Sequence, residues 1–270
     1  MNPDISFVTS CYNSAPFVDG LLSDLLKQTH ENFEIIFVDS NSTDESADLA
    51  EVWAEKDSRI KVIRQPKRVP YGASWIEGWM NAKGRIVCNS NTDDRSFPWR
   101  ATQVINALAN HQRSNPDTPC FLYGGYETRR NDVAVAAGFP PPYSVEDMTR
   151  FFRCGVHVHW ENRLVTDFNA DFDVMLGAAH EYKSAFDYWL VLYFMYLGAV
   201  GVNIPSCFSI YNQRDDSVEQ SNKELSNFES LRAIESFFPG SKAIQDLYSK
   251  TKQDSPEYFE RYQEFKGRFE

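Results

Sequence analysis

The chain has 270 residues, which is long enough to bury a substantial hydrophobic core in one large domain, or in one domain with an appendage. It carries 27 Lys and Arg residues against 38 Asp and Glu residues, and the resulting formal net charge of −11 argues against general nucleic-acid binding. Hydrophobic residues make up 42% and charged residues 24%, fractions that are typical of a globular protein.

The first hundred residues alternate between strand patterns and helix patterns. We expect strands at residues 5–9, 33–38, 60–63 and near 86–88. We expect helices at residues 17–26, 42–56 and 75–80, the second of them opened by a capping box at 42–45. This alternation predicts an α/β fold, with a mostly parallel sheet covered by helices on both faces.

The pattern loosens after Asp94. We expect a helix at 98–109, a strand at 121–126 that leads into a glycine turn, a loop or flap at 131–145, and a strongly apolar helix at 186–197. The charged, amphipathic tail from Leu225 onward is expected to be helical. We therefore predict a main domain over residues 1–220 and a helical C-terminal extension over 221–270 that packs on it.

Polar side chains follow three of the predicted strands where each strand ends, at Ser10–Asn13, Asp39–Ser42 and Asn91–Asp94. In open α/β sheets, ligands bind beyond the carboxyl ends of the strands. Clustered carboxylates repel one another unless a divalent cation or a metal–polyphosphate complex lies between them. The pattern predicts a metal-assisted site for an anionic substrate, and a purely structural acidic turn is the alternative.

Five motifs, in order, resemble those of the family 2 nucleotide-sugar glycosyltransferases. Residues 6–13 (SFVTSCYN) resemble that family's SVIIPTYN strand, and residues 34–44 (EIIFVDSNSTD) resemble its EIIVVDDGSTD segment. Residues 91–94 (NTDD) match the register of DxDD, residues 187–190 (DYWL) resemble DxWL, and residues 211–217 (YNQRDDS) resemble YRxHxxS. Each motif is weak alone, but five at sensible spacing are specific.

The resemblance covers roughly the first 220 residues and implies a GT-A fold with hexosyltransferase activity. The donor would be a nucleotide diphosphate sugar, with a UDP-sugar as the first expectation. The acceptor would be a hydroxyl of a glycan or of a lipid-linked saccharide. A non-catalytic glycosyltransferase-like module that only binds a nucleotide is the alternative. A dinucleotide oxidoreductase is disfavoured, because no Gly-rich turn follows the first strand.

The resemblance also implies which residues contact the nucleotide. Tyr12, Asn13 and Asp39 would line its site, with Asp39 accepting a hydrogen bond from the uracil imide N–H. Tyr12 as a core aromatic residue is the alternative. Gly72 follows a basic loop at residues 64–68 and would permit close approach to the nucleotide. The alternative for the basic residues of that loop is that they are simply exposed to solvent and bind no nucleotide.

The metal site implied by the resemblance departs from the family pattern. Asp93 would bind the Mn²⁺ or Mg²⁺ that bridges the diphosphate, and Asn91 would lie near the metal or the ribose. Asn91 is an amide where the family has its first Asp. Asp94 would bind the donor sugar, support the site or cap the next helix. Arg214 takes the place of a metal-binding His, and it would instead pair with the diphosphate.

Transfer to a hydroxyl needs a carboxylate that accepts the acceptor's proton. Asp187, at the start of an apolar helix, is the first candidate, although an acidic residue there also stabilises a helix N-terminus. Glu181 is the second candidate, because the family's usual Glu-Asp pair falls at Ser184 and Ala185. Inversion at the anomeric carbon follows if the base and the leaving group lie on opposite faces of the sugar.

Two further groups of residues have alternative explanations. His157 and His159 would lie on one face of a strand, as weak metal ligands, as part of an acceptor pocket or packed with Trp160. The tryptophans would stack on sugar rings or pack in the core; they are Trp75, Trp79, Trp99 and Trp160.

The five widely separated cysteines and the N-terminal sequence bear on the compartment. An odd number of cysteines without a CxxC pair predicts reduced, buried thiols. The N-terminus lacks a signal-peptide pattern, and no apolar run approaches the roughly 20 residues that span a bilayer. We expect a cytoplasmic location, and analogy with the family alone suggests a position at the inner face of the membrane.

Overall fold

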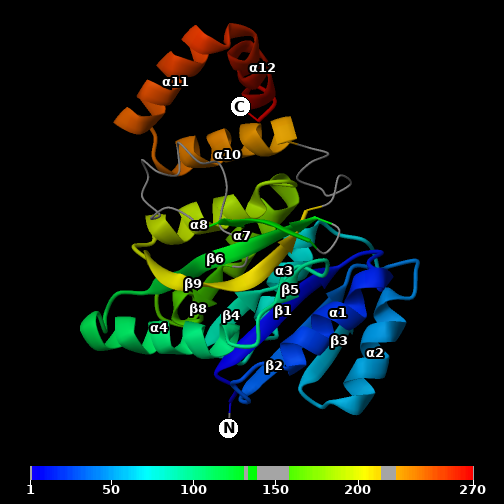
Figure 1. The fold of residues 1–270 in the computed structure, drawn as a ribbon. Coiled ribbons are helices and arrows are strands. Elements are labelled where there is room, and N and C mark those ends of the chain that lie inside the picture. The colour runs from blue at the N-terminus through cyan, green and yellow to red at the C-terminus, as the bar shows by residue number, and fades with distance from the viewer. Residues whose placement is uncertain (1, 131–132, 139–157, 214–222, 270) are drawn as a thin grey trace.

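The computed structural model describes residues 2–130, 133–138, 158–213 and 223–269 (Figure 1). Its strands are β1 (Ile5–Cys11), β2 (Phe33–Asp39), β3 (Ile60–Arg64), β4 (Ile86–Asn89), β5 (Arg95–Ser96), β6 (Cys120–Arg130), β7 (Val133–Gly138), β8 (His159–Glu161) and β9 (Val200–Asn212). Its helices are α1 (Ala15–Leu26), α2 (Ser46–Lys56), α3 (Tyr71–Met80), α4 (Arg100–Ser114), α6 (Arg163–Thr166), α7 (Phe172–Glu181), α8 (Phe186–Tyr196), α10 (Lys223–Phe237), α11 (Lys242–Asp254) and α12 (Pro256–Lys266).

The described strands form one sheet in the order β3-β2-β1-β4-β8-β6-β9-β5, with β7 paired to β6. Strands β1 to β4 are parallel, as their near-continuous apolar runs predict for strands that are buried on both faces. The sheet then becomes mixed, because β8 lies antiparallel to both β4 and β6. The predicted α/β class is confirmed, and the carboxyl ends of β1, β2 and β4 meet at one edge.

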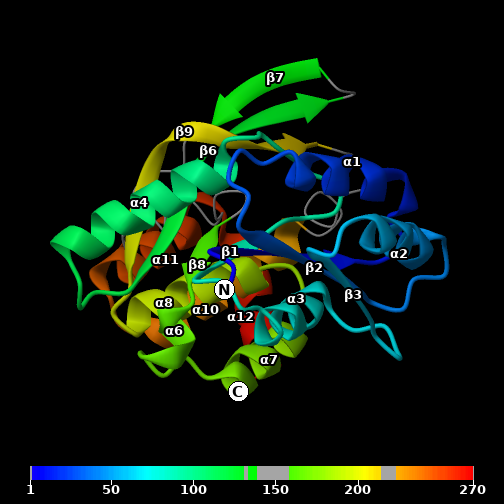
Figure 2. The ribbon, with the colours of Figure 1, turned by 90° about the horizontal axis from the view of Figure 1, so that it is seen from below.

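Helices cover both faces of this sheet (Figure 2). Helices α1, α2 and α4 pack on one face, over a core cluster that includes Leu22, Phe37 and Val104. Helices α3, α7 and α8 pack on the other face, around Trp79 and Phe194.

The tryptophan alternatives separate in the structure. Trp75, Trp79 and Trp160 are buried together, with the rings of Trp79 and Trp160 stacked at 6.2 Å, so they belong to the core and not to a sugar platform. Trp99 is instead 41% exposed. The burial of the first three follows from the helical spacing of α3 and from the position of β8 in the centre of the sheet.

Helix α10 packs on α8, and α11 and α12 lie on the far side of α10, as Figure 1 shows. Ala233 and Ile234 of α10 are buried in the same core cluster as α8, and the Phe237 ring lies 5.4 Å from that of Trp189. The division into a main domain over residues 1–220 and an extension over 221–270 stays a prediction. Nowhere in the described ranges is a helix both long and apolar enough to cross a bilayer.

Two predictions about the middle of the chain are wrong. Residues 133–138 of the predicted loop form β7, whose Val-Ala alternation pairs with β6, while the rest of 131–145 lies outside the described residues. The expected glycine turn is absent too, because β6 continues through Gly124 and Gly125 with an irregular register against β9. A Cβ atom at Gly124 would lie 2.3 Å from Phe208, so this glycine permits close packing and does not mark a turn.

Burial makes three thiols chemically quiet. Cys11, Cys88 and Cys120 are buried and free, whereas Cys154 lies outside the described residues. Burial raises the pKa of Cys11 to about 11 and that of Cys88 to about 12. The predicted reduced, buried state is confirmed for these three.

We expect iodoacetamide at pH 8 to label Cys88 much more slowly in the native protein than in urea. The thiolate is the reacting form, and a pKa raised by about three units lowers its fraction roughly 1,000-fold. Mass spectrometry of tryptic peptides measures the labelling. Equal rates in the native and unfolded protein would contradict the burial of this thiol.

Candidate active site

Three loops meet at the carboxyl edge of the parallel strands. The Ser40 N–H donates to the Cys11 carbonyl (2.8 Å), and the Ser90 N–H donates to the Val8 carbonyl (2.9 Å). The Thr92 hydroxyl donates to the Ser10 carbonyl (2.9 Å), which ties the loop after β4 to that after β1. The three predicted polar clusters therefore form one surface.

Asn13 joins the first two of these loops. Its backbone lies in the left-handed region, with φ of 46°, a conformation that Asn tolerates better than most residues. Its side-chain Oδ1 accepts from the Thr43 N–H (2.8 Å), and its own N–H donates to the Ser42 hydroxyl (2.9 Å). These bonds give Asn13 a role in shaping the site, and its direct contact with a nucleotide stays a prediction.

The predicted capping box at residues 42–45 is wrong. Helix α2 begins at Ser46, and Asp44 connects the starts of two helices instead. The Asp44 carboxylate accepts from the Ala15 N–H (3.1 Å) and from the Ser46 N–H (3.0 Å). The Ser42 hydroxyl is turned toward Asn13, because the loop must close against α1 as well as open α2.

Asp39 is buried at the end of β2, with 2% of its surface exposed. Its Oδ2 accepts from the Ser42 N–H (3.0 Å), whereas its buried Oδ1 has no hydrogen-bond partner among the described residues. A buried carboxylate oxygen without a donor is unfavourable, so this atom is suited to receive a donor from a ligand.

The basic loop after β3 contributes a cation beside Tyr12. The Arg68 guanidinium lies 4.0 Å from the centre of the Tyr12 ring, in cation–π geometry. Arg64 is instead paired with the carboxylates of Asp48 and Glu51 on α2. Arg68 is thus placed at the site, and Arg64 belongs to the surface of α2.

Hydrogen bonds hold the acidic loop after β4 in place. Asp94 is buried, and its carboxylate accepts from the Asn91 side-chain amide (2.9 Å) and from the Asn212 N–H (3.0 Å). The Asn212 side chain donates to the Asp93 carbonyl (2.6 Å). Asn91 and Asp94 therefore brace the loop, and Asp93 is its half-buried carboxylate. Arg214 lies outside the described residues.

The metal prediction depends mainly on Asp93. Within the described ranges, no group of three or more His, Cys, Asp or Glu residues is arranged to hold a metal ion. Mg²⁺ commonly binds through one or two carboxylates together with substrate phosphates and water. Asp93 fits that mode, in which the diphosphate of the substrate supplies the remaining oxygens.

Sequence reasoning missed Arg100, a buried arginine in the first turn of α4. Its guanidinium donates to the Asn89 carbonyl (2.6 Å) and to the hydroxyls of Ser90 (3.1 Å) and Ser96 (3.2 Å). Burial lowers its pKa to about 10. Arg100 therefore supports the acidic loop from beneath and places a positive charge behind it. The signal in the sequence is its helical register with the buried Val104.

His159 is the fourth partner of Arg100 and is not a metal ligand. Its Nε2 accepts from the Arg100 Nε (3.0 Å), and its Nδ1 donates to the Leu122 carbonyl (3.2 Å). Both ring nitrogens of this buried residue are occupied, which requires the neutral tautomer. His157 lies outside the described residues.

The start of α8 is connected to the same edge through α3. The Ser40 hydroxyl exchanges hydrogen bonds with the backbone of Val69 (2.9 and 3.1 Å), just before α3. A Cβ atom at Gly72 would lie 2.4 Å from the Phe186 ring, so Gly72 allows α3 to pack closely on α8. That packing explains the glycine, and its predicted contact with a nucleotide stays untested.

The two candidate bases have different surroundings. Asp187 is exposed in the first turn of α8, where its carboxylate accepts from the Tyr188 N–H (2.9 Å). Glu181 ends α7 and forms an ion pair with Arg232 of α10. Asp187 follows Phe186, whose ring packs against Gly72 at the start of α3, and the choice of base between the two carboxylates stays a prediction.

A second missed residue, Glu229 of α10, supplies a carboxylate at the start of α8. It is only 3% exposed, and it accepts from the N–H groups of Lys183 (3.0 Å), Ser184 (2.8 Å) and Ala185 (3.0 Å). Burial raises its pKa above the ordinary value. Glu229 thus binds the backbone of the segment in which the family's Glu-Asp pair was expected, and it comes from the C-terminal extension.

Comparisons with known proteins agree with this geometry. Residues 6–170 match the family described as glycosyl transferase family 2. The glycosyltransferase GlyG of Streptococcus pneumoniae is 32% identical over 94 residues, which are 35% of this chain and 31% of GlyG. The aligned stretch thus spans about a third of that relative's length.

Two solved structures share the fold. Residues 1–349 of TarS of S. aureus, in complex with UDP-GlcNAc, align with a TM-score of 0.68 at 16% identity over 94% of this chain and 73% of that fragment. The mannosyltransferase PcManGT of Pyrobaculum calidifontis, in complex with GDP-Man and Mn²⁺, aligns with a TM-score of 0.62 at 14% identity over 97% of this chain and 73% of PcManGT. These likenesses confirm the predicted GT-A fold.

Proposed function

The chain belongs to glycosyl transferase family 2, and from this premise we propose that it transfers a sugar from a UDP-sugar to a hydroxyl of a glycan or lipid-linked saccharide, with inversion. The single observation that carries the proposal is the unpartnered Oδ1 of Asp39, buried where the three loops meet. The UDP-GlcNAc complex of TarS supports a uridine donor.

Asp39 explains how the base would be recognised. An unpartnered carboxylate oxygen accepts a hydrogen bond and donates none, so it favours a base with a ring N–H, such as uracil, over cytosine or adenine. Tyr12 would stack on the base, and Arg68, now over the Tyr12 ring, would move aside or cover the base from its other face. Asn13 would hold the loops that frame this pocket.

The diphosphate would lie beside the acidic loop. Asp93 would hold the Mn²⁺ or Mg²⁺, with Asn91 and Asp94 keeping the loop in shape. The metal would act as a Lewis acid toward the diphosphate leaving group. Arg100 adds a buried positive charge behind the loop, which favours the same developing negative charge.

Asp187 would accept the proton of the acceptor hydroxyl, with Glu181 as the alternative base. Inversion follows if the acceptor enters on the side of the sugar opposite the diphosphate. The expected position at the inner face of the membrane, in the cytoplasm, stays a prediction.

A nucleotide screen tests the proposal. We expect UDP with Mn²⁺ to raise the melting temperature, and UDP-sugars to be hydrolysed slowly or transferred to a glycan. No response to any nucleotide would contradict the proposal. Binding without any turnover would favour the non-catalytic nucleotide-binding module.

Replacing Asp39 by Asn should weaken UDP binding roughly 10- to 100-fold, the size of a lost hydrogen bond to a charged group. The Asn oxygen must accept from the Ser42 N–H, so the amide NH₂ would face the imide N–H of uracil. The same change should raise the affinity for CDP relative to that for UDP, because the cytosine ring has an acceptor nitrogen where uracil has its imide N–H. Calorimetry measures both affinities.

Asp48→Asn is the matched control, because Asp48 is an exposed carboxylate on α2 that pairs with Arg64. It should bind UDP like the wild type. An Asp39→Asn variant with unchanged UDP affinity would remove Asp39 from the nucleotide site.

A further inference from the structure

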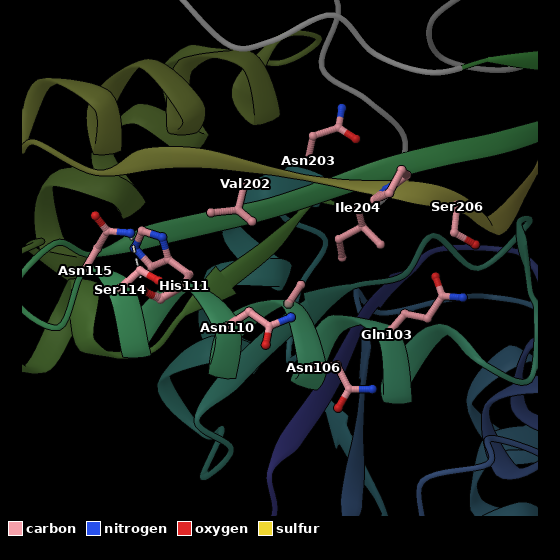
Figure 3. A pocket seen from close by; sticks show the side chains of 12 residues that line it. Gln103, Asn106, Asn110, His111, Ser114, Asn115, Val202, Asn203, Ile204 and Ser206 are labelled. Carbon is pink, nitrogen blue, oxygen red and sulfur yellow. Dashed lines mark hydrogen bonds between the residues drawn. The ribbon is translucent and has the colours of Figure 1, made fainter.

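A second concave surface lies between α4 and the first half of β9, away from the strand-end site (Figure 3). This α4–β9 groove encloses about 550 Å³, within the range of small-ligand pockets. Its lining residues are Gln103, Asn106, Ala107, Asn110, His111, Ser114, Asn115, Val202, Asn203, Ile204, Pro205 and Ser206.

The lining of the groove combines amide and hydroxyl side chains with a larger exposed apolar area, and none of the described residues that line it is Lys, Arg, Asp or Glu. That is unusual in a chain with a net charge of −11. A side-chain amide has an oxygen that accepts hydrogen bonds and an NH₂ group that donates them, and a hydroxyl can do both. Sugar hydroxyls have the same double character, whereas charged side chains strengthen the binding of phosphates and carboxylates.

Helix α4 presents its amides at regular spacing. Gln103, Asn106, Asn110 and Ser114 recur at intervals of three or four residues, which places them on one face of the helix. Figure 3 shows them opposite β9. The Gln103 Oε1 is buried without a hydrogen-bond partner among the described residues, so a polar ligand atom would satisfy it.

An aromatic surface lies at one end of the groove. The Trp99 ring is stacked on that of Phe97, at 4.8 Å between centroids and 6° between planes, and remains 41% exposed. Its indole N–H donates to the Cys207 carbonyl (2.9 Å), which fixes the ring beside Ser206. Trp99 also lies one helical turn before Gln103. A rigid exposed indole offers an apolar face to the C–H groups of a sugar ring.

We propose that the α4–β9 groove binds a neutral oligosaccharide, with Trp99 as the stacking platform and Gln103 and Asn106 as hydrogen-bonding residues. If the chain is a glycosyltransferase, as proposed above, this ligand is a stretch of the acceptor glycan held near the acidic loop. Trp99 lies only five residues after Asp94 in the sequence, which places this end of the groove nearest the loop.

A peptide is the less favoured occupant. Peptides commonly extend a sheet edge by backbone hydrogen bonding, and β9 contributes Pro205, which has no N–H, to the groove. The absence of charged side chains also gives no partner for acidic or basic peptides. A short amide-rich groove with one aromatic end fits a sugar chain better.

Titration of the ¹⁵N-labelled protein, without a nucleotide, tests the proposal. The probes are cellohexaose, maltohexaose and chitohexaose, with a hyaluronan hexasaccharide as an anionic comparison and a neutral ten-residue peptide as the alternative ligand. We expect at least one neutral hexasaccharide to shift backbone resonances at residues 99–115 and 200–207, together with the side-chain amides of Gln103 and Asn106.

The double variant Gln103→Ala, Asn106→Ala should bind that hexasaccharide about ten-fold more weakly, because two hydrogen bonds are lost from an otherwise intact helix. Trp99→Ala should weaken it further. Gln253→Ala, which removes an exposed amide from α11, is the matched control and should bind like the wild type.

Several outcomes would overturn the proposal. These are no shift with any neutral saccharide, shifts away from the groove, equal binding by the double variant, or preference for the anionic saccharide or the peptide. Asp187→Asn should retain the groove's affinity. If the protein transfers no sugar, the saccharide titration still tests the groove. If no saccharide binds the groove, the nucleotide screen still tests the proposed glycosyltransferase function.

Discussion

Replacement of Asp187 by Asn should lower the rate of sugar transfer by roughly 10²- to 10⁴-fold, the usual contribution of a general base, while UDP binding stays unchanged. Asparagine keeps the size of the side chain and can still accept from the Tyr188 N–H. It cannot take a proton from the acceptor hydroxyl. Initial rates with saturating donor and acceptor, together with calorimetry of UDP binding, separate the two effects.

Glu181→Gln is the matched comparison, because it is the other carboxylate that would serve as the base. Its ion pair with Arg232 holds it at the junction of α7 and α10, so we expect transfer close to the wild-type rate. Loss of activity in Glu181→Gln with full activity in Asp187→Asn would reverse the assignment. Loss of one acidic residue from a first helical turn costs only about 0.3–1 kcal/mol of stability, so both variants should remain folded. A thermal melt of each variant checks this.

The parallel half of the fold could be predicted from the sequence because its signals are local. Each strand from β1 to β4 is a short apolar run, and a helical pattern follows β1, β2 and β3. Because parallel strands end at the same edge, the placement of Asp39 and Asp93 at one edge of the sheet follows from periodicity alone. The structure confirms that placement, while the chemical roles of the two residues stay predictions.

The less regular features could not be predicted because tertiary contacts decide them. Ser42 has the right spacing for a capping box, but the neighbouring loop offers its hydroxyl a different donor, the Asn13 N–H. Gly72 resembles a nucleotide-binding glycine, yet the ring that needs its small size is that of Phe186, more than a hundred residues later. Local sequence contains neither partner.

The same limit hid the residues that support the site. Arg100 looks like a surface arginine at the start of a helix, and only the fold shows that the Asn89 carbonyl and the Ser90 and Ser96 hydroxyls surround its guanidinium. Glu229 lies 45 residues after Ser184 in the sequence, within a charged tail whose glutamates look alike. Glu229 differs from the other described glutamates of this tail because it is buried. Contacts with residues far away in the sequence bury it, so the local sequence does not reveal it.

Glu229 joins the C-terminal extension to the segment just before α8. Replacement of Glu229 should have the second large effect. Replacement by Ala leaves the N–H groups of Lys183, Ser184 and Ala185 without their acceptor. Unsatisfied buried donors cost about 1–3 kcal/mol each, and water that enters the space recovers part of that, so we expect a loss of about 3 kcal/mol in unfolding free energy. Urea denaturation measures it.

The variant should also transfer sugar more slowly without losing affinity for UDP. Those three N–H groups belong to the segment just before α8, and Asp187 lies in the first turn of that helix. A displaced helix start moves the base relative to the acceptor, so kcat falls while the KM for the donor stays near the wild-type value. A purely structural role would lower stability and leave kcat per folded molecule unchanged.

Glu224→Ala is the control on the same helix, because Glu224 is half exposed and pairs only with Arg261 among the described residues. Exposed ion pairs contribute little to stability, so this variant should keep both stability and transfer rate. A loss in Glu224→Ala as large as that in Glu229→Ala would mean that α10 tolerates no change, and the specific role of Glu229 would then be rejected.

The pH dependence gives an independent check on the buried carboxyl group. Burial raises the pKa of Glu229 in the folded protein above its ordinary value of 4.5, so the folded state holds this proton more tightly than the unfolded chain does. The associated stability is complete below pH 4.5 and is lost as the pH rises through the raised pKa. The difference in unfolding free energy between the wild type and Glu229→Ala should therefore be largest near pH 4 and narrow toward pH 7. A difference that widens with pH would mean that the three N–H donors outweigh desolvation and hold the pKa of Glu229 below its ordinary value.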